Sequence, residues 1–109
     1  MLSMSAFAAL ADRTRREIIE VLATGESRVT DLVERFPISQ PAISRHLRLL
    51  RESGLVGVRP SGRERIYYLE AGAIEEVAHW ATEIQREVTK RFDALGRHLD
   101  QMEKQSHGK

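Results

Sequence analysis

The sequence predicts one mainly α-helical domain with a small β-hairpin, and three observations support this fold class. A chain of 109 residues, 41% hydrophobic and 30% charged, is long enough for one core and too short for two. Apolar residues recur with helical spacing up to Ser53 and again from about Gly72. Between these stretches, two β-rich runs flank a segment that contains proline and glycine. We expect a single domain over residues 1–105, followed by a disordered tail over 106–109.

Two helices are expected at the start of the chain. The first is short and apolar and contains Phe7 and Leu10, and the second runs from Asp12 to Ala23. Asp12 is a suitable N-cap, because its carboxylate can accept hydrogen bonds from the first helical turn. Gly25 is a suitable stop, since glycine is favoured just after a helix ends.

Two short helices joined by a tight turn are expected next. After a short extended piece, Thr30 is expected to cap a helix that ends before Pro37, since the residue before a proline is pushed away from helical angles. Ser39 is expected to cap a second helix, with Pro41 in its first turn, where a missing N–H costs nothing. Gly54 is expected to end it.

The helix over residues 39–53 has an apolar face and a polar face. At about 100° per residue, Ile43, Leu47 and Leu50 fall within about 60° of one another, so we expect them in the core. His46 lies at the flank of this face and is expected to pack or to bind a backbone carbonyl. Serine and arginine gather on the opposite side, where arginine forks could reach guanine edges and phosphates. The candidate DNA-contacting residues here are Ser39, Gln40, Pro41, Ser44, Arg45, Arg48 and Arg51, and a plain solvated face is the alternative.

The hairpin is expected to have a basic tip over residues 59–65. Its strands contain Leu55 to Val58 and Ile66 to Leu69, with one of the two tyrosines at 67 and 68 packed inward. A helix pair followed by such a hairpin is a winged helix-turn-helix, in which the hairpin lies along phosphates or enters the minor groove. The candidate DNA-contacting residues of this wing are Arg59, Ser61, Gly62, Arg63 and Arg65.

A long helix is expected over residues 72–105, with apolar residues at intervals of seven. It would be roughly 50 Å long, whereas a globule of this size is about 34 Å across, so it cannot bury its apolar stripe alone. The simplest partner is a second copy across a twofold axis. The expected interface residues on this helix are Ile74, Val77, Trp80, Ala81, Ile84, Val88, Phe92 and Leu95.

The charge is concentrated in the middle of the chain. The net charge is +1 overall, but residues 28–68 contain eight arginines against four acidic residues, which gives +4. Arginine has a planar fork suited to phosphates and guanine edges, so this distribution favours a nucleic-acid partner. A protein-interaction module is a second possibility, but it leaves the +4 segment unexplained.

Several function classes are excluded by what the chain lacks. It has no cysteine, which removes disulfides, thiolate metal sites and cysteine nucleophiles. Its four histidines stand in no catalytic motif, so we expect neither an enzyme nor a cofactor. The longest uncharged run, residues 1–11, is far shorter than the ~20 residues that cross a bilayer, so we expect a cytoplasmic protein with no membrane partner.

Three segments resemble the ArsR/SmtB family of winged-helix repressors, and the resemblance covers most of residues 5–100. They read ALADRTRREIIEVL, VTDLVERFPISQPAISRHLRLLRESGLV and VRPSGRERIYYL. The resemblance implies a homodimer that binds an operator near its own gene and represses transcription. It implies DNA contacts at Ser39, Gln40, Ser44, Arg45, Arg48, Arg59, Ser61, Gly62, Arg63 and Arg65. The family's first and last helices form the dimer interface, which adds Phe7 and Leu10.

The metal sites of that family are not intact in this sequence. The cysteine pair of its soft-metal sensors is missing. In its other site, the motifs D-x-H and H-x-x-E/H are broken, since Val77 precedes His79 by two residues and Gln101 follows His98 by three. We therefore expect no metal. A zinc-responsive repressor using His79 and Glu83, one helical turn apart, is the alternative. The sequence specifies no small-molecule or protein effector.

Overall fold

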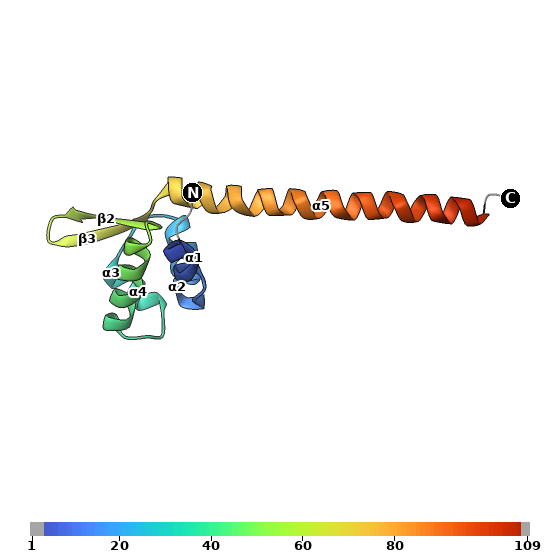
Figure 1. Cartoon of the computed structure of the whole chain (residues 1–109). Helices are drawn as coiled ribbons and strands as arrows, with labels where there is room; N and C mark the ends of the chain where they lie inside the picture. Colours follow the sequence, from blue (N-terminus) through green and yellow to red (C-terminus); the bar gives the residue numbers. More distant parts are fainter. Residues whose placement is uncertain (1–3, 108–109) are drawn as a thin grey trace. The chain divides into compact units, whose positions relative to one another are not determined.

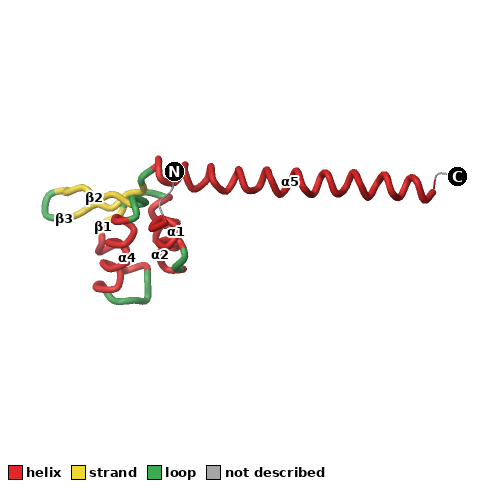
Figure 2. Tube along the Cα trace, in the orientation of Figure 1, coloured by secondary structure: helices red, strands yellow, loops and turns green. Residues whose placement is uncertain are grey.

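The computed structural model describes residues 4–107, with side chains from Ala6 to Glu103. The chain divides between Glu76 and Val77 into two compact units, which are described separately. The first unit holds α1 (Met4–Leu10), α2 (Arg13–Ala23), β1 (Ser27–Arg28), α3 (Val29–Arg35), α4 (Gln40–Glu52), β2 (Val56–Ser61), β3 (Glu64–Leu69) and the start of α5 (Ala71–His107) (Figures 1 and 2). The rest of α5 forms the second unit. The predicted fold class, helices with a small hairpin, is confirmed.

Most helix ends lie where local chemistry places them. The Asp12 carboxylate accepts a hydrogen bond from the Arg15 N–H at 2.9 Å and caps α2. The Ser39 hydroxyl accepts one from the Ala42 N–H at 3.3 Å and caps α4. Gly54 follows α4 with a φ of +81°, a left-handed conformation that glycine adopts without strain. These three predictions are confirmed.

The start of α3 differs from the prediction. Its N-cap is Arg28, and the helix begins at Val29 with no side-chain cap, so the predicted cap at Thr30 is wrong. Arg28 pairs with Ile66 as the last residue of β1, and its side chain binds Asp31 in the first turn of α3. The chain therefore passes from strand into helix without an intervening loop.

The sheet has three antiparallel strands in the order β1-β3-β2. The predicted hairpin is β2 and β3, and the extended piece before α3 adds β1 beside β3. The strands are longer than predicted, because Ser61 still pairs with Glu64 and only Gly62 and Arg63 form the turn. Gly62 has a φ of +63°, which a tight turn requires. Pro60 lies within the outer strand β2, where a proline can be accommodated because only one side is paired.

The core of the first unit lies between α2, α3, α4 and the sheet. The apolar face of α4 is confirmed, since Ile43, Leu47 and Leu50 are each 0% exposed. Tyr67 is buried and Tyr68 is half-buried, as alternation along a strand predicts. The other buried apolar residues of the described chain are Ala6, Ala9, Ile18, Leu22, Leu32, Phe36, Leu55 and Val56.

The second unit is a helix with one apolar face. At about 100° per residue, eight apolar side chains lie within about 40° of Val88 around the axis. We call them the α5 stripe: Val77, Ala81, Ile84, Val88, Phe92, Leu95, Leu99 and Met102. The helix continues to residue 107, so the expected tail is helical at 106 and 107, and residues 108 and 109 lie outside the described residues. No helix in the described range has the length and apolar character of a bilayer span.

Candidate nucleic-acid interface

A shallow groove of about 520 Å³ lies between α4 and β3. Because the apolar face of α4 is turned into the core, its serine and arginine side chains are exposed on the other side. The groove is lined by Pro41, Ser44, Arg45, Arg48, Arg51, Arg65 and Tyr67. The structure thus brings together five of the seven DNA-contacting residues predicted on α4 and one predicted arginine of the wing.

A second hollow of about 350 Å³ continues this groove toward the hairpin turn. It shares Ser44, Arg65 and Tyr67 with the first, and it adds Arg63 at the turn. Its remaining lining residues are Arg28, Val29, Thr30 and Glu64. Ser39, Gln40, Ser61 and Gly62 are exposed but line neither hollow. The combined surface, called the arginine groove below, runs from α4 to the end of the hairpin.

Most of the arginine forks in this groove are available to a ligand. Among the described residues, Arg45, Arg51, Arg63 and Arg65 form no ion pair. Arg48 has only a 4.0 Å contact with Glu52, and both side chains are about two-thirds exposed, so this pair contributes little. The groove therefore presents several uncompensated positive charges to a polyanion.

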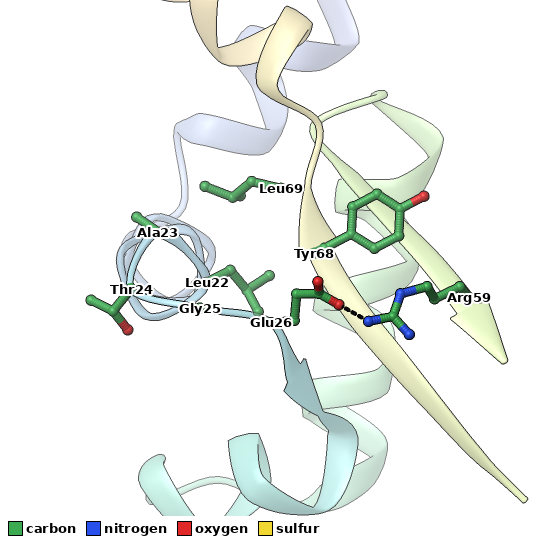
Figure 3. A pocket seen from close by; sticks show the side chains of 8 residues that line it. All are labelled: Leu22, Ala23, Thr24, Gly25, Glu26, Arg59, Tyr68 and Leu69. Atoms are coloured by element: carbon green, nitrogen blue, oxygen red, sulfur yellow. Dashed lines mark hydrogen bonds and ion pairs between the residues drawn. The ribbon is translucent and has the colours of Figure 1, made fainter. Parts of the chain in front are cut away.

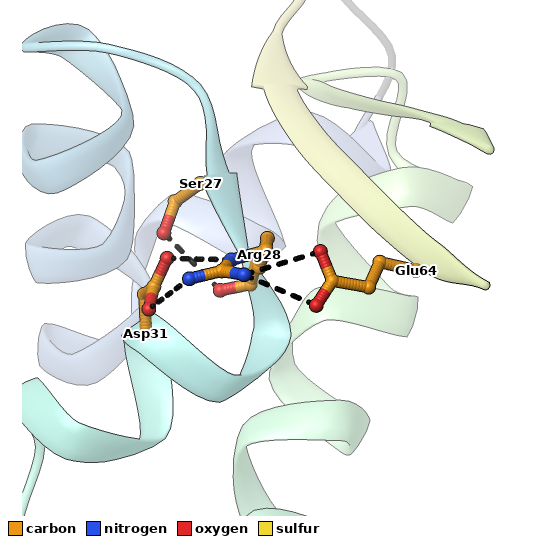
Figure 4. Close-up of polar contacts among 4 residues, drawn as sticks. All are labelled: Ser27, Arg28, Asp31 and Glu64. Atoms are coloured by element: carbon orange, nitrogen blue, oxygen red, sulfur yellow. Dashed lines mark hydrogen bonds and ion pairs between the residues drawn. The ribbon is translucent and has the colours of Figure 1, made fainter. Parts of the chain in front are cut away.

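Arg28 is different, because it is held by two carboxylates. Its guanidinium donates to Asp31 at 3.1 and 3.3 Å and to Glu64 at 3.1 and 3.3 Å (Figure 4). The hydrogen bond from Arg28 lowers the pKa of Asp31 below its usual value, and the same bond raises the pKa of Arg28. Arg28 thus ties the first turn of α3 to the wing strand β3. The sequence prediction did not single it out, although an Asp three residues later was an available signal.

Arg59 lies on the opposite face of the hairpin from Arg65. Successive side chains of a strand point to opposite faces, and Arg59 pairs with Ile66 whereas Arg65 pairs with Pro60. The Arg59 guanidinium forms an ion pair with Glu26, in the loop before β1 (Figure 3). The structure therefore does not bring Arg59 into the arginine groove, and its predicted DNA contact stays a prediction.

His46 faces α2 and not the groove. Its Nδ1 lies 3.3 Å from a guanidinium nitrogen of Arg15 and 3.8 Å from the Asp12 carboxylate, and its side chain is 19% exposed. Arg15 also donates to the backbone carbonyl of Ala9 at 2.8 Å. His46 therefore packs against α2 with side-chain partners, which agrees with the prediction that it packs and differs from the alternative of a backbone carbonyl partner. This cluster fixes the start of α2 against α4 and the end of α1.

The remaining predicted residues lie on the first and last helices. Phe7 and Leu10 on α1 are half-buried, as are Ile74 and Val77 on α5. Trp80, Ile84, Val88, Phe92 and Leu95 are 43% to 66% exposed. His79 and Glu83 are exposed one turn apart. In the described range, no three His, Asp or Glu side chains lie close enough to hold a metal ion.

Comparison with known proteins gives a consistent result. Residues 12–58, from the N-cap of α2 into β2, match the model of the bacterial regulatory protein arsR family. The chain is similar to the HTH-type transcriptional regulator Rv2034 of Mycobacterium tuberculosis, at 48% identity over 60% of this chain and 61% of that protein. It is similar to the arsenical resistance operon repressor of Escherichia coli, at 42% identity over 77% of this chain and 69% of the repressor. It also resembles the solved structure of the ArsR-like transcriptional regulator from Rhodococcus sp. RHA1, with a TM-score of 0.70, 35% identity and coverage of 84% of this chain and 86% of that one.

Proposed function

Because the chain belongs to the arsR family of bacterial regulatory proteins, which bind DNA and regulate transcription and are not enzymes, we propose that it is a homodimeric repressor. In this proposal α4 and the wing read a near-palindromic operator, and binding does not depend on a metal. The repressor activity is proposed from relatives such as the Escherichia coli protein, which is named as a repressor.

The observation that carries the proposal is the arginine groove. Four arginines, at positions 45, 48, 51 and 65, line one hollow beside the exposed face of α4. Contacts from such side chains to phosphates supply most of the affinity and are independent of sequence. Sequence choice then comes from groups near the base edges, for which Gln40, Ser44 and Arg48 are the candidates.

The proposed dimer rests on the α5 stripe. Apolar side chains that stay half-exposed along one helix face are covered most simply by the same face of a second copy. In a twofold dimer, the α4 helices of the two copies could enter successive major grooves, which are about 34 Å apart. This spacing is the reason for expecting an operator with two similar halves.

The proposed independence from metals rests on the available ligands. Arsenic and other soft metals favour thiolates, and this chain has no cysteine. His79 and Glu83 offer two ligands, whereas a closed zinc site takes about four. The link to arsenic in the name of the Escherichia coli repressor is therefore not carried over to this chain.

Fluorescence anisotropy with the gene's own upstream DNA tests the proposal. With about eight phosphate contacts per dimer, log K against log salt is expected to slope by about −7. Arg48→Ala is expected to cost about 1–3 kcal/mol on the operator and much less on random DNA, whereas Arg63→Ala weakens both alike. Arg13→Ala is the matched control, because Arg13 pairs with Glu17 on α2 outside the groove.

Four outcomes would contradict parts of the proposal. A slope near zero would contradict the electrostatic groove, and equal losses for Arg48→Ala on operator and random DNA would contradict its role in sequence choice. Binding that collapses when zinc is added to the chelator-treated protein would favour the zinc-responsive alternative. No selective DNA binding would favour the protein-interaction module.

A further inference from the structure

A pocket of about 500 Å³, open to solvent, lies where the hairpin meets the end of α2, and it reaches around β3, since Tyr68 and Leu69 point to opposite faces of that strand. It is formed by the end of α2, the loop that follows, and the back of the hairpin. Its lining residues are Leu22, Ala23, Thr24, Gly25, Glu26, Arg59, Tyr68 and Leu69 (Figure 3). Its volume lies within the range of about 300–1,000 Å³ that small-molecule sites occupy.

The pocket combines an apolar wall with one ion pair. Figure 3 shows Leu22 and Leu69 on one side of β3, the Tyr68 ring on the other side of this strand, and the Glu26 carboxylate with the Arg59 guanidinium bound to it. Among the described residues that line the pocket, only Glu26 and Arg59 are charged, and both side chains are about half-exposed. Glu26 therefore already binds one organic cation, the guanidinium group of Arg59.

The surroundings of Glu26 favour a cation over an anion. The C-terminal end of α2 opens onto the pocket, and the last carbonyls of a helix carry partial negative charge. A Cβ on Gly57 would lie 2.5 to 2.6 Å from the phenol of Tyr68 and 2.5 Å from a carboxylate oxygen of Glu70. The absence of a side chain at Gly57 thus lets an aromatic ring and a second carboxylate lie over this face. If Arg59 leaves, the surroundings are negative and include an aromatic face, which attracts cations.

We propose that this pocket binds an organic cation, a guanidinium or primary ammonium group on a short apolar body, which replaces Arg59 at Glu26. The charged group would take the position of the Arg59 fork, and the apolar body would lie against Leu22 and Leu69. Binding would release Arg59, whose fork could then contact a DNA phosphate. By linkage, a ligand that frees a DNA-binding group strengthens DNA binding, and DNA strengthens binding of the ligand. This last step rests on the proposed function, whereas the pocket does not.

An NMR titration without DNA tests the pocket directly. The probe is n-butylguanidinium, and the neutral n-butylurea and the anionic n-butyrate are comparisons of similar shape. We expect saturable shifts of the Gly25 and Tyr68 amide signals with n-butylguanidinium, with a Kd of about millimolar for so small a ligand. Arg59→Ala removes the internal competitor and should bind the probe at least about threefold more tightly, while Glu26→Gln should abolish saturation. Glu17→Gln is the matched control, because it removes an exposed Glu–Arg pair of α2 outside the pocket and should leave the titration unchanged.

Other results of this titration would overturn the proposal. Saturation by n-butyrate alone would make Arg59 the ligand-binding group and the pocket an anion site. Equal responses to all three compounds would show an apolar contact without charge selection. No saturable shift with n-butylguanidinium in wild type and in Arg59→Ala would exclude the cation site.

A DNA-binding measurement tests the coupling separately. At constant ionic strength, a saturating amount of n-butylguanidinium should tighten operator binding of the wild type by about threefold and leave Arg59→Ala unchanged. A positive titration with unchanged operator affinity would overturn the coupling and leave the pocket standing. Loss of all selective DNA binding would overturn the proposed function, while the titration would still decide the pocket.

Discussion

The two units of the chain use the same kinds of apolar residue in opposite ways. In the first unit, Ile18, Leu32, Leu47 and Leu55 are all 0% exposed. In the second, the isoleucine, valine and leucine side chains of the α5 stripe from residue 84 onward stay 43% to 53% exposed, namely Ile84, Val88, Leu95 and Leu99. Burying one such side chain stabilises a fold by about 1.5–3 kcal/mol. The first unit therefore has its core within one chain, whereas the second has a surface that gains stability only when it is covered.

The largest expected effect comes from creating a cavity in the core of the first unit. Leu50→Ala should lower the free energy of unfolding by about 2–5 kcal/mol, because Leu50 is 0% exposed and its removal leaves a cavity. Urea denaturation measures this change. Leu49→Ala is the matched control one residue away, since Leu49 is 36% exposed, and it should cost less than about 1 kcal/mol. Equal losses at the two positions would contradict the described core.

The next effect comes from charging the open stripe. Phe92→Glu should weaken the proposed dimer by at least about 100-fold, because it would bury a carboxylate between apolar faces. Sedimentation over a range of protein concentrations measures this. The dimer should also make the wild-type urea midpoint rise with protein concentration, and Phe92→Glu should remove that dependence.

Thr82→Glu is the control for this stripe. It adds the same charge to an exposed position about 120° away from the stripe around the helix. A dimer that resists Phe92→Glu, or one that Thr82→Glu disrupts equally, would show that the stripe is not the interface.

A smaller effect concerns the capping of α4 in the first unit. Ser39→Ala should cost about 1 kcal/mol of stability, because the first turn of α4 loses the hydroxyl that accepts the Ala42 N–H. Ser39→Asp replaces the cap with an equivalent one and should restore most of the loss. Urea midpoints for the three proteins at one protein concentration test this, and a loss that Ser39→Asp shares would point away from capping.

The smallest effect is a pH dependence. The hydrogen bond from the backbone N–H of Arg15 lowers the pKa of Asp12 below its usual value. The charged form of Asp12 therefore adds stability to the folded protein. This stability is fully present above the usual pKa and is lost as the pH falls through the lower pKa of the folded state. Asp12→Asn keeps a capping oxygen without the charge, so its urea midpoint should fall less than that of the wild type between about pH 5 and pH 2. Parallel curves would contradict this assignment.

Features governed by neighbouring residues could be predicted from the sequence. The buried face of α4 follows from the spacing of Ile43, Leu47 and Leu50, and the caps at Asp12 and Ser39 act within three residues of their partners. The four arginines that line the main groove were all among the predicted contacts. Helical periodicity separates Arg45 and Arg48 from the apolar face of α4, whereas Arg65 was predicted only as part of the basic hairpin tip.

Features governed by distant partners could not be predicted. Arg28 replaces Thr30 at the start of α3 because it ends a strand beside β3 and binds Glu64, 36 residues away. Arg59 was grouped with the other wing arginines, but it lies on the face of the hairpin opposite Arg65. Its partner Glu26 is 33 residues away in the sequence. The sequence shows that these charges exist, whereas only the register of the sheet decides which of them meet.

Pro60 has a consequence for how this protein behaves at high concentration. A hairpin that extends away from the core to reach DNA has an outer strand. The backbone groups of such a strand can pair with strands of other molecules, which is a common route to aggregation. Proline has no backbone N–H to offer an incoming strand, and Pro60 lies in that outer strand beside the charged Arg59. The hairpin can therefore have two six-residue arms while resisting the edge-to-edge growth that leads to fibres.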